Sequence, residues 1–253
     1  MPAADPLFNW LLRQGDSCLV LGHRLSEWCG HAPVLEEDIA LANVALDLIG
    51  QARFWLTLAG EVEGAGRDEN QLAYLRDAHA YRNVLLVEQK NGDFGVTMTR
   101  QFLFDAWHWL LLGELHKSSD RRVADIAAKA VKEVAYHLER SRDWVVRLGD
   151  GTEDSHRRMR RAVDQLWPFT GELFEMDEVD RAMVERGIAV DLAGLRDRWL
   201  DLVRTTLDEA TLAMPDPDAW MQRDGKRGRH TEHLGYLLAE MQFVQRAYPG
   251  ATW

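Results

Sequence analysis

The sequence predicts an all-α fold built around an up-and-down four-helix bundle, with additional N- and C-terminal helices. Apolar residues recur with helical periodicity along almost the whole chain, and no stretch alternates as a half-buried strand would. Four of these periodic stretches are much longer than the average helix of about 11 to 12 residues, and short connections join them. We expect a single domain over residues 1–253, with a core bundle over about 34–149 and a helical extension over about 152–253.

The N-terminal part is predicted to contain a short helix followed by the first long one. Asp16 is a suitable cap for a helix over about 17–29, which Gly30 would end. Pro33 suits the first turn of the next helix, which should run to about Ala59. The bundle is therefore expected to begin near residue 34.

Three further long helices are predicted over about 69–88, 96–116 and 121–148. The turn KNGDFG should end the first of them, and GDG should end the last. Shorter helices are expected over about 154–174, 178–187, 191–213 and 235–247. Long helices joined by short turns are typical of antiparallel neighbours in a bundle.

The charge of the chain excludes several classes of partner. A formal net charge of −11 argues against nucleic acid and against an anionic membrane surface, because both attract basic proteins. The two cysteines, Cys18 and Cys29, are too few for a disulfide framework and are expected to be reduced. The N-terminus lacks the features of a secretory signal, and no uninterrupted apolar run is long enough for a membrane span. We therefore expect a cytoplasmic protein.

One acidic residue interrupts the apolar part of each long helix. These residues are Asp47, Asp77, Asp105 and Glu133, spaced 28 to 30 positions apart. Four antiparallel helices with one inward acid each can bring the acids together, as in di-iron carboxylate bundles. For any single helix a solvated polar stripe explains such a residue better. The repetition in all four favours a buried polar centre.

The histidines that a di-iron site requires are missing from the expected places. Two of the four helices should carry Glu-x-x-His, which predicts histidine at the positions of Ala80 and Tyr136. His79 and His137 lie one position away, a rotation of about 100° around the helix. We therefore assign no metal, catalytic or cofactor-binding residue and regard the four acids as vestigial ligand positions. Compensation of their charge is expected from protons, His108, Tyr136, Arg76 or Arg100.

Several stretches resemble the C subunit of the phenylacetyl-CoA epoxidase family. They are LVLGHRLSEWCGHAPVLEEDIALANVALDLIGQAR (19–53), LLVEQKNGDFG (85–95), FDAWHW (104–109), AVKEVAYHLERSRDW (130–144) and GKRGRHTEHLGYLLAEMQFVQR (225–246). The resemblance implies a ferritin-like fold and membership of a multicomponent monooxygenase in phenylacetate breakdown. It implies that a homologous catalytic subunit holds the di-iron centre, that a reductase supplies electrons, and that this chain is the structural member without a cofactor of its own.

Two surface features are candidates for contacts with partners. Trp220 and Trp253 lie in a proline-rich loop and at the chain end, and tryptophan is enriched at interface hot spots. Lys226, Arg227 and Arg229 form a local basic cluster that suits an acidic partner or the phosphates of coenzyme A, although ordinary solvated loop charge explains it slightly better.

Two other functions remain open at this point. The chain is a catalytic di-iron oxygenase subunit if the Asp-rich set binds iron despite the lost imidazoles. It is a ferritin-like binding protein if it assembles with itself into a symmetric homo-oligomer. Only a structural subunit explains both the helix pattern and the missing histidines.

Overall fold

The computed structural model describes residues 5–251 and contains eleven α-helices, several short 3-10 helices and no strand within that range. The prediction of an all-α, ferritin-like fold class is confirmed. The chain divides into two compact units, of which the first combines Met1–Lys90 with Asp224–Trp253 and the second is Asn91–Arg223. Neither boundary falls near residue 149, where the sequence suggested the end of a core bundle.

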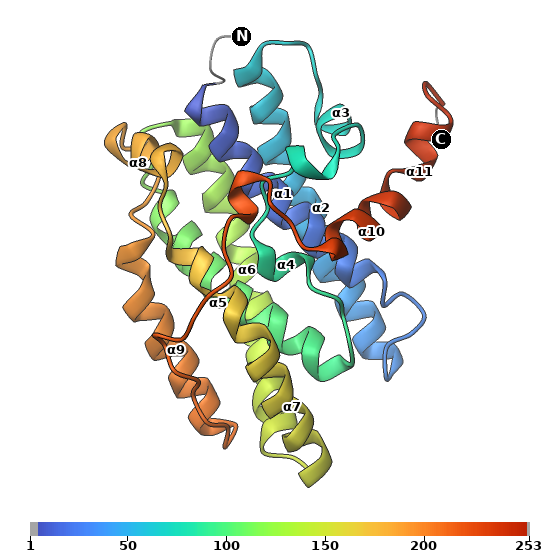
Figure 1. Ribbon diagram of the computed structural model, residues 1–253, viewed down its shortest axis with the longest axis vertical. Helices are drawn as coiled ribbons and strands as arrows, with labels where there is room; N and C mark the ends of the chain where they lie inside the picture. The colour runs from blue at the N-terminus through green and yellow to red at the C-terminus, as the bar shows by residue number, and fades with distance from the viewer. Residues whose placement is uncertain (1–4, 252–253) are drawn as a thin grey trace. The chain divides into compact units, whose positions relative to one another are not determined.

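The first unit is built on a pair of long helices, α1 and α2, which lie against each other (Figure 1). Helix α1 covers Pro6–Ser26 and α2 covers Leu35–Glu63. Gly15 allows their close approach, because a Cβ there would lie 2.8 Å from the side chain of Leu56. The rings of Trp10 and Trp55 meet edge to face in the core, with centroids 6.1 Å apart. The smaller elements of this unit are α3 (Glu69–Tyr74), η1 (Ala78–Ala80), α4 (Leu85–Glu88), η5 (Gly225–Arg227), α10 (Glu232–Met241) and α11 (Phe243–Ala247).

The predicted start of the first helix is wrong. Helix α1 begins ten residues before Asp16, where the Asp5 carboxylate caps it by accepting from the Leu7 amide at 2.9 Å and Pro6 occupies the first turn. Asp16 is fully buried and forms an ion pair with Arg76 instead of capping a helix. The pair explains how an acidic residue is tolerated inside α1.

The predicted long helix over 69–88 is also wrong. The chain there forms α3, η1 and α4, with extended backbone at Tyr81 and Val84. This path lets the Arg82 amide donate to the Asp16 carboxylate at 2.8 Å, while Arg76 donates to the same group at 3.0 Å. A tertiary interaction has therefore overridden the helical periodicity of the segment.

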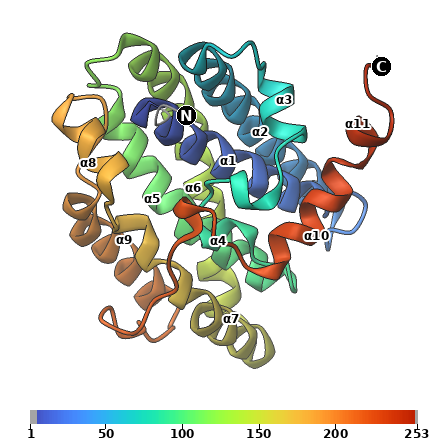
Figure 2. The same ribbon diagram turned by 45° about the horizontal axis from the view of Figure 1, so that its top comes forward.

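The second unit is built on α5 (Phe94–Leu115) and α6 (Arg121–Gly149), which contact each other and also contact α7 and α9 (Figure 2). Asp93 and Asp120 cap the two long helices by accepting from backbone amides. These helices agree with the predicted ranges to within two residues at each end. The remaining elements are α7 (Glu153–Leu166), η2 (Trp167–Phe169), η3 (Gly171–Phe174), α8 (Glu178–Glu185), η4 (Ala193–Leu195) and α9 (Arg196–Glu209).

Candidate functional site

A buried polar centre lies between α5 and α6 in the second unit. The carboxylate of Asp105 is fully buried and accepts from Gln101 Nε2 at 2.7 Å and from Ser141 Oγ at 2.8 Å. Gln101 lies one turn before Asp105 on α5, whereas Ser141 comes from α6. The carboxylate therefore links the two helices through neutral donors.

Burial controls the protonation of this centre. Desolvation raises the pKa of Asp105 to about 6, against the opposing effects of the His137 charge and the hydrogen bonds from Ser141 and Gln101. Burial lowers the pKa of His108 to about 3, and His137 lowers it further by charge repulsion. Among the described residues, His108 Nδ1 is buried without a hydrogen-bond partner. Near neutral pH, His108 is therefore uncharged and Asp105 is mostly ionised.

The predicted acidic residues of the first unit do not form such a centre. Asp77 is exposed, precedes η1 and pairs with Arg246 at 3.0 Å, and Ala80 ends that 3-10 turn. The expectation that Asp77 faces inward is therefore wrong, because the helix that would orient it does not form. Asp47 lies on α2 and is half-buried.

Helix α6 presents a different face from the one predicted. Glu133 is half-buried and Tyr136 is 55% exposed, whereas His137 and Ser141 are buried. The signal for this face was present in the sequence. The buried positions of the helix recur at intervals of three or four and are Val123, Ala127, Ala130, Val134, His137, Ser141, Val145 and Gly149. That pattern includes His137 and Ser141 and excludes Glu133 and Tyr136.

Most of the groups expected to neutralise the acids have other partners. Arg76 pairs with Asp16 in the first unit, and Arg100 donates to the side chain of Asn91 at 2.7 Å. Gln101 and Ser141, which sequence reasoning missed, provide the hydrogen bonds to Asp105. Glutamine and serine carry no charge, so their hydrogen bonds add a dipolar stabilisation to the charge interactions of Asp105 with His137 and Arg140.

The donor set does not fit a di-iron centre. Such a centre requires several carboxylates and imidazoles around two ions. In the described part of the chain, no group of three His, Cys, Asp or Glu residues is arranged to hold a metal ion. Of the four predicted acids, only Asp105 is fully buried, whereas Asp47 and Glu133 are half-buried and Asp77 is exposed. We therefore derive no chemistry through iron in this chain.

The first unit contains a second buried acid, Glu88, which binds the returning C-terminal segment. Its carboxylate accepts from His230 Nδ1 at 2.8 Å, the Thr231 amide at 2.6 Å and Asn83 Nδ2 at 2.9 Å. The other ring nitrogen of His230 lies 3.1 Å from the carbonyl oxygen of Tyr81. Both ring nitrogens of His230 thus lie against oxygen atoms of the first unit. These contacts hold the segment in place.

The basic side chains in this segment are less exposed and less free of ion pairs than the sequence suggested. Lys226 is only 8% exposed, while Arg227 and Arg229 lie 3.5 Å and 3.3 Å from the carboxylate of Asp224. The three residues therefore do not form a patch of three exposed cations. Trp220 is exposed, as an interface residue would be in the isolated chain, and Trp253 lies outside the described residues.

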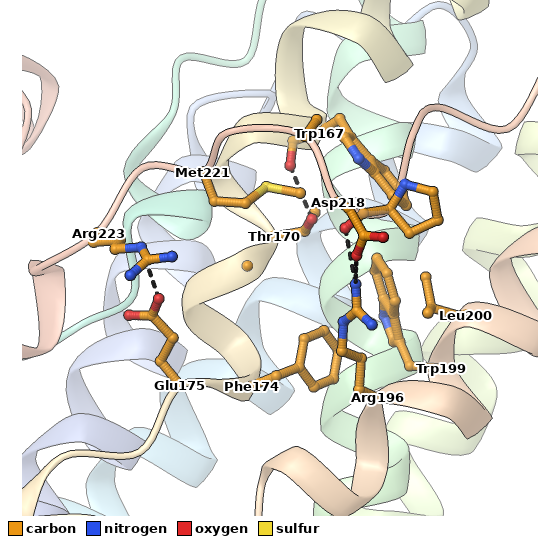
Figure 3. Close-up of a pocket in the computed structure, with 13 residues that line it drawn as sticks. Trp167, Thr170, Phe174, Glu175, Arg196, Trp199, Leu200, Asp218, Met221 and Arg223 are labelled. Carbon is orange, nitrogen blue, oxygen red and sulfur yellow. Dashed lines mark hydrogen bonds and ion pairs between the residues drawn. The ribbon is translucent and has the colours of Figure 1, made fainter.

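A cavity of about 350 Å³ in the second unit is lined by aromatic side chains (Figure 3). The ring of Trp199 lies 5.6 Å from that of Trp167 and 5.2 Å from that of Phe174, measured between centroids. Its two arginines have carboxylate partners, since Arg196 pairs with Asp218 at 3.3 Å and Arg223 with Glu175 at 2.8 Å. Residues of the Asp105 centre do not line it. The cavity shows no arrangement of nucleophile, base or metal ligands.

The comparisons with known proteins decide the family. The model of the family described as phenylacetic acid catabolic protein matches residues 2–253. The chain belongs to this family. A relative in Escherichia coli (strain K12), named as the C subunit of 1,2-phenylacetyl-CoA epoxidase, is 53% identical over 249 residues, which cover 98% of this chain and all of the relative. The resemblance to this family that the sequence showed is thereby confirmed. It covers nearly the whole chain.

Proposed function

We propose that this chain is the non-catalytic, structural subunit of a multicomponent phenylacetyl-CoA epoxidase that acts in phenylacetate breakdown. Its role is to bind and stabilise a homologous catalytic subunit, which holds the di-iron centre and receives electrons from a reductase. The reaction of the whole assembly is the insertion of one oxygen atom from O2 into the aromatic ring of the acyl-CoA substrate. We place this assembly in the cytoplasm.

The observation that carries this proposal is the nature of the Asp105 centre. Asp105 accepts from the neutral side chains of Gln101 and Ser141, and no group of three His, Cys, Asp or Glu residues in the described part of the chain is arranged to hold a metal ion. The centre links α5 to α6 and lacks the set of carboxylates and imidazoles that a di-iron site requires.

Iron analysis combined with activity tests the proposal. The lone chain, the lone catalytic subunit and their purified complex are each assayed for iron and for epoxidation with the reductase present. We expect about two irons per catalytic subunit, as a di-iron site requires, and less than about a tenth of that in the lone chain.

The variant Asp105→Asn sharpens the test. We expect the complex that contains it to keep its iron content and its turnover, because the residue supports packing only. Iron in stoichiometric amount in the lone chain, lost in Asp105→Asn together with activity, would instead identify this chain as a catalytic subunit. A stable homo-oligomer of this chain that does not bind the catalytic subunit would also contradict the proposal.

A further inference from the structure

Helix α2 of the first unit has two apolar faces, and only one of them is buried. The buried face includes Leu41, Leu48 and Trp55. The other face presents Leu35, Ile39 and Leu46, which are 71%, 54% and 66% exposed. By length and composition, α2 is the one described helix that is apolar enough to cross a membrane. Its two apolar faces account for that composition.

The exposed face has the spacing of a helix-packing surface. Leu35, Ile39, Ala42 and Leu46 follow one another at intervals of four, three and four, and Gly50 comes four positions later. Intervals of four and three are those of the a and d positions through which two helices interlock. A Cβ at Gly50 would meet no atom within 4 Å, so this position leaves a hollow for a side chain from outside. We call these five residues the α2 seam.

The α2 seam is long enough for a stable helix contact. It covers four turns, roughly 22 Å along the helix at 1.5 Å per residue. Large exposed aliphatic side chains in one row are uncommon on a monomeric surface and mark interaction sites. The knob-and-hollow pattern indicates that the occupant is another α-helix.

Charge decides between a second copy of this chain and a different protein. Residues 35–52 contain four acids, Glu36, Glu37, Asp38 and Asp47, and no Lys, Arg or His, and the next residue, Arg53, already pairs with Glu69 at 3.4 Å. At 100° per residue, Glu36 and Asp47 lie on the same flank of the seam. A second copy would bring another set of acids to the same contact on a chain of net charge −11. The complementary occupant is an apolar helix flanked by Lys or Arg.

We infer that the α2 seam is the docking face for a long helix of the catalytic oxygenase subunit, an inference that rests on the proposed function. The partner helix carries an apolar row that interlocks with Leu35, Ile39 and Leu46, with basic residues opposite Asp47. Burying this row removes exposed apolar surface from both proteins, which is the main driving force of such association.

The test compares Leu46→Asp with a matched control, Leu75→Asp, in binding to the purified catalytic subunit by titration calorimetry. Leu75 is 53% exposed and lies in the same unit outside α2. We expect Leu46→Asp to weaken binding at least tenfold and Leu75→Asp to leave it unchanged. Both variants should keep the helical circular dichroism and the melting temperature of the wild type, because both positions are exposed in the free chain.

Three further variants probe the shape and the charge of the seam. Leu46→Ser should weaken binding without adding a charge, and Asp47→Lys should weaken it more than Asp47→Asn does. A wild-type chain that does not bind the catalytic subunit would contradict the proposed function itself. If the wild-type chain binds the catalytic subunit no more tightly than Leu46→Asp and Leu46→Ser do, the α2 seam is not the docking face. That result would leave the proposed function intact. A lone chain that dimerises in sedimentation and becomes monomeric with Leu46→Asp would assign the seam to a second copy.

Discussion

At the scale of single residues, Asp105 and His108 make opposite contributions to the pH dependence of stability. The pKa of Asp105 is raised from 3.8 to about 6, so its contribution is present below pH 4 and is lost as the pH rises through 6. The pKa of His108 is lowered from 6.5 to about 3, so its contribution is present above pH 6.5 and is lost as the pH falls towards 3. Over the range between pH 4 and 6 the two effects largely cancel.

The variant Asp105→Asn separates these contributions. It removes the titrating acid while its side chain still accepts from Gln101 and donates to the Ser141 hydroxyl. Relative to wild type, its free energy of unfolding should rise between pH 4 and pH 7 by roughly 2.5 kcal/mol, which is most of the effect of the shift of the Asp105 pKa. Urea denaturation at pH 4, 5.5 and 7 measures the difference, in which the effect of His108 cancels.

Asp143→Asn is the matched control, because Asp143 is exposed on the same helix as Ser141. Its difference from wild type should not change with pH over this range. If the free energy of unfolding of Asp105→Asn, relative to wild type, does not increase with pH, the pKa of the buried Asp105 carboxylate is not near 6.

At the scale of elements, two glycines of α2 have opposite environments. A Cβ at Gly60 would lie 2.2 Å from the carbonyl oxygen of Arg67, whereas a Cβ at Gly50 would meet no atom within 4 Å. Gly60→Ala should therefore lower the free energy of unfolding, because the loop after α2 must move. Gly50→Ala should raise it by up to about 1 kcal/mol through helix propensity.

Thermal and urea denaturation of the two variants check this prediction. The same substitution is compared within one helix, so its intrinsic propensity effect is common to both. Equal effects at the two positions would mean that the loop is free to move away from Gly60 at no cost.

The accuracy of sequence-based prediction also differs from element to element. Helices α5 and α6 were predictable because their aspartate caps, lengths and apolar patterns agree, and α2 was predictable from its length and apolar pattern, although Pro33 precedes it and no side chain caps it. The segment 69–88 was not, because its path depends on Arg76 and Arg82 reaching a carboxylate on α1 about 60 residues earlier in the chain. Local periodicity contains no information about such a partner.

The candidate site was predictable only in part for a similar reason. Asp105 was identified because an acid in FLFDAWHW is conspicuous, and it is fully buried. Its partners Gln101 and Ser141 were missed because four equally spaced acids suggested a centre made of carboxylates. The buried face of α6, read across all its turns, would have indicated His137 and Ser141.

At the scale of the whole molecule, the C-terminal segment completes the first unit by binding Glu88. His230 Nδ1 and the Thr231 amide bond to different oxygens of Glu88, and Glu88→Gln removes the charge and replaces one of these acceptors, so this segment should open more often. We expect faster tryptic cleavage after Arg227 and Arg229, followed by mass spectrometry. Glu232→Gln, at a 72% exposed side chain on the same segment, is the control and should leave the cleavage rate unchanged.

The discontinuous first unit also affects the order in which this chain matures on the ribosome. Residues 1–90 leave the exit tunnel well before their remaining partner, Asp224–Trp253, has been synthesised. At an elongation rate of about 5–20 residues per second, the delay is on the order of ten seconds. During that interval Glu88 lacks His230, and the long N-terminal helices are already available to chaperones or to a nascent neighbour.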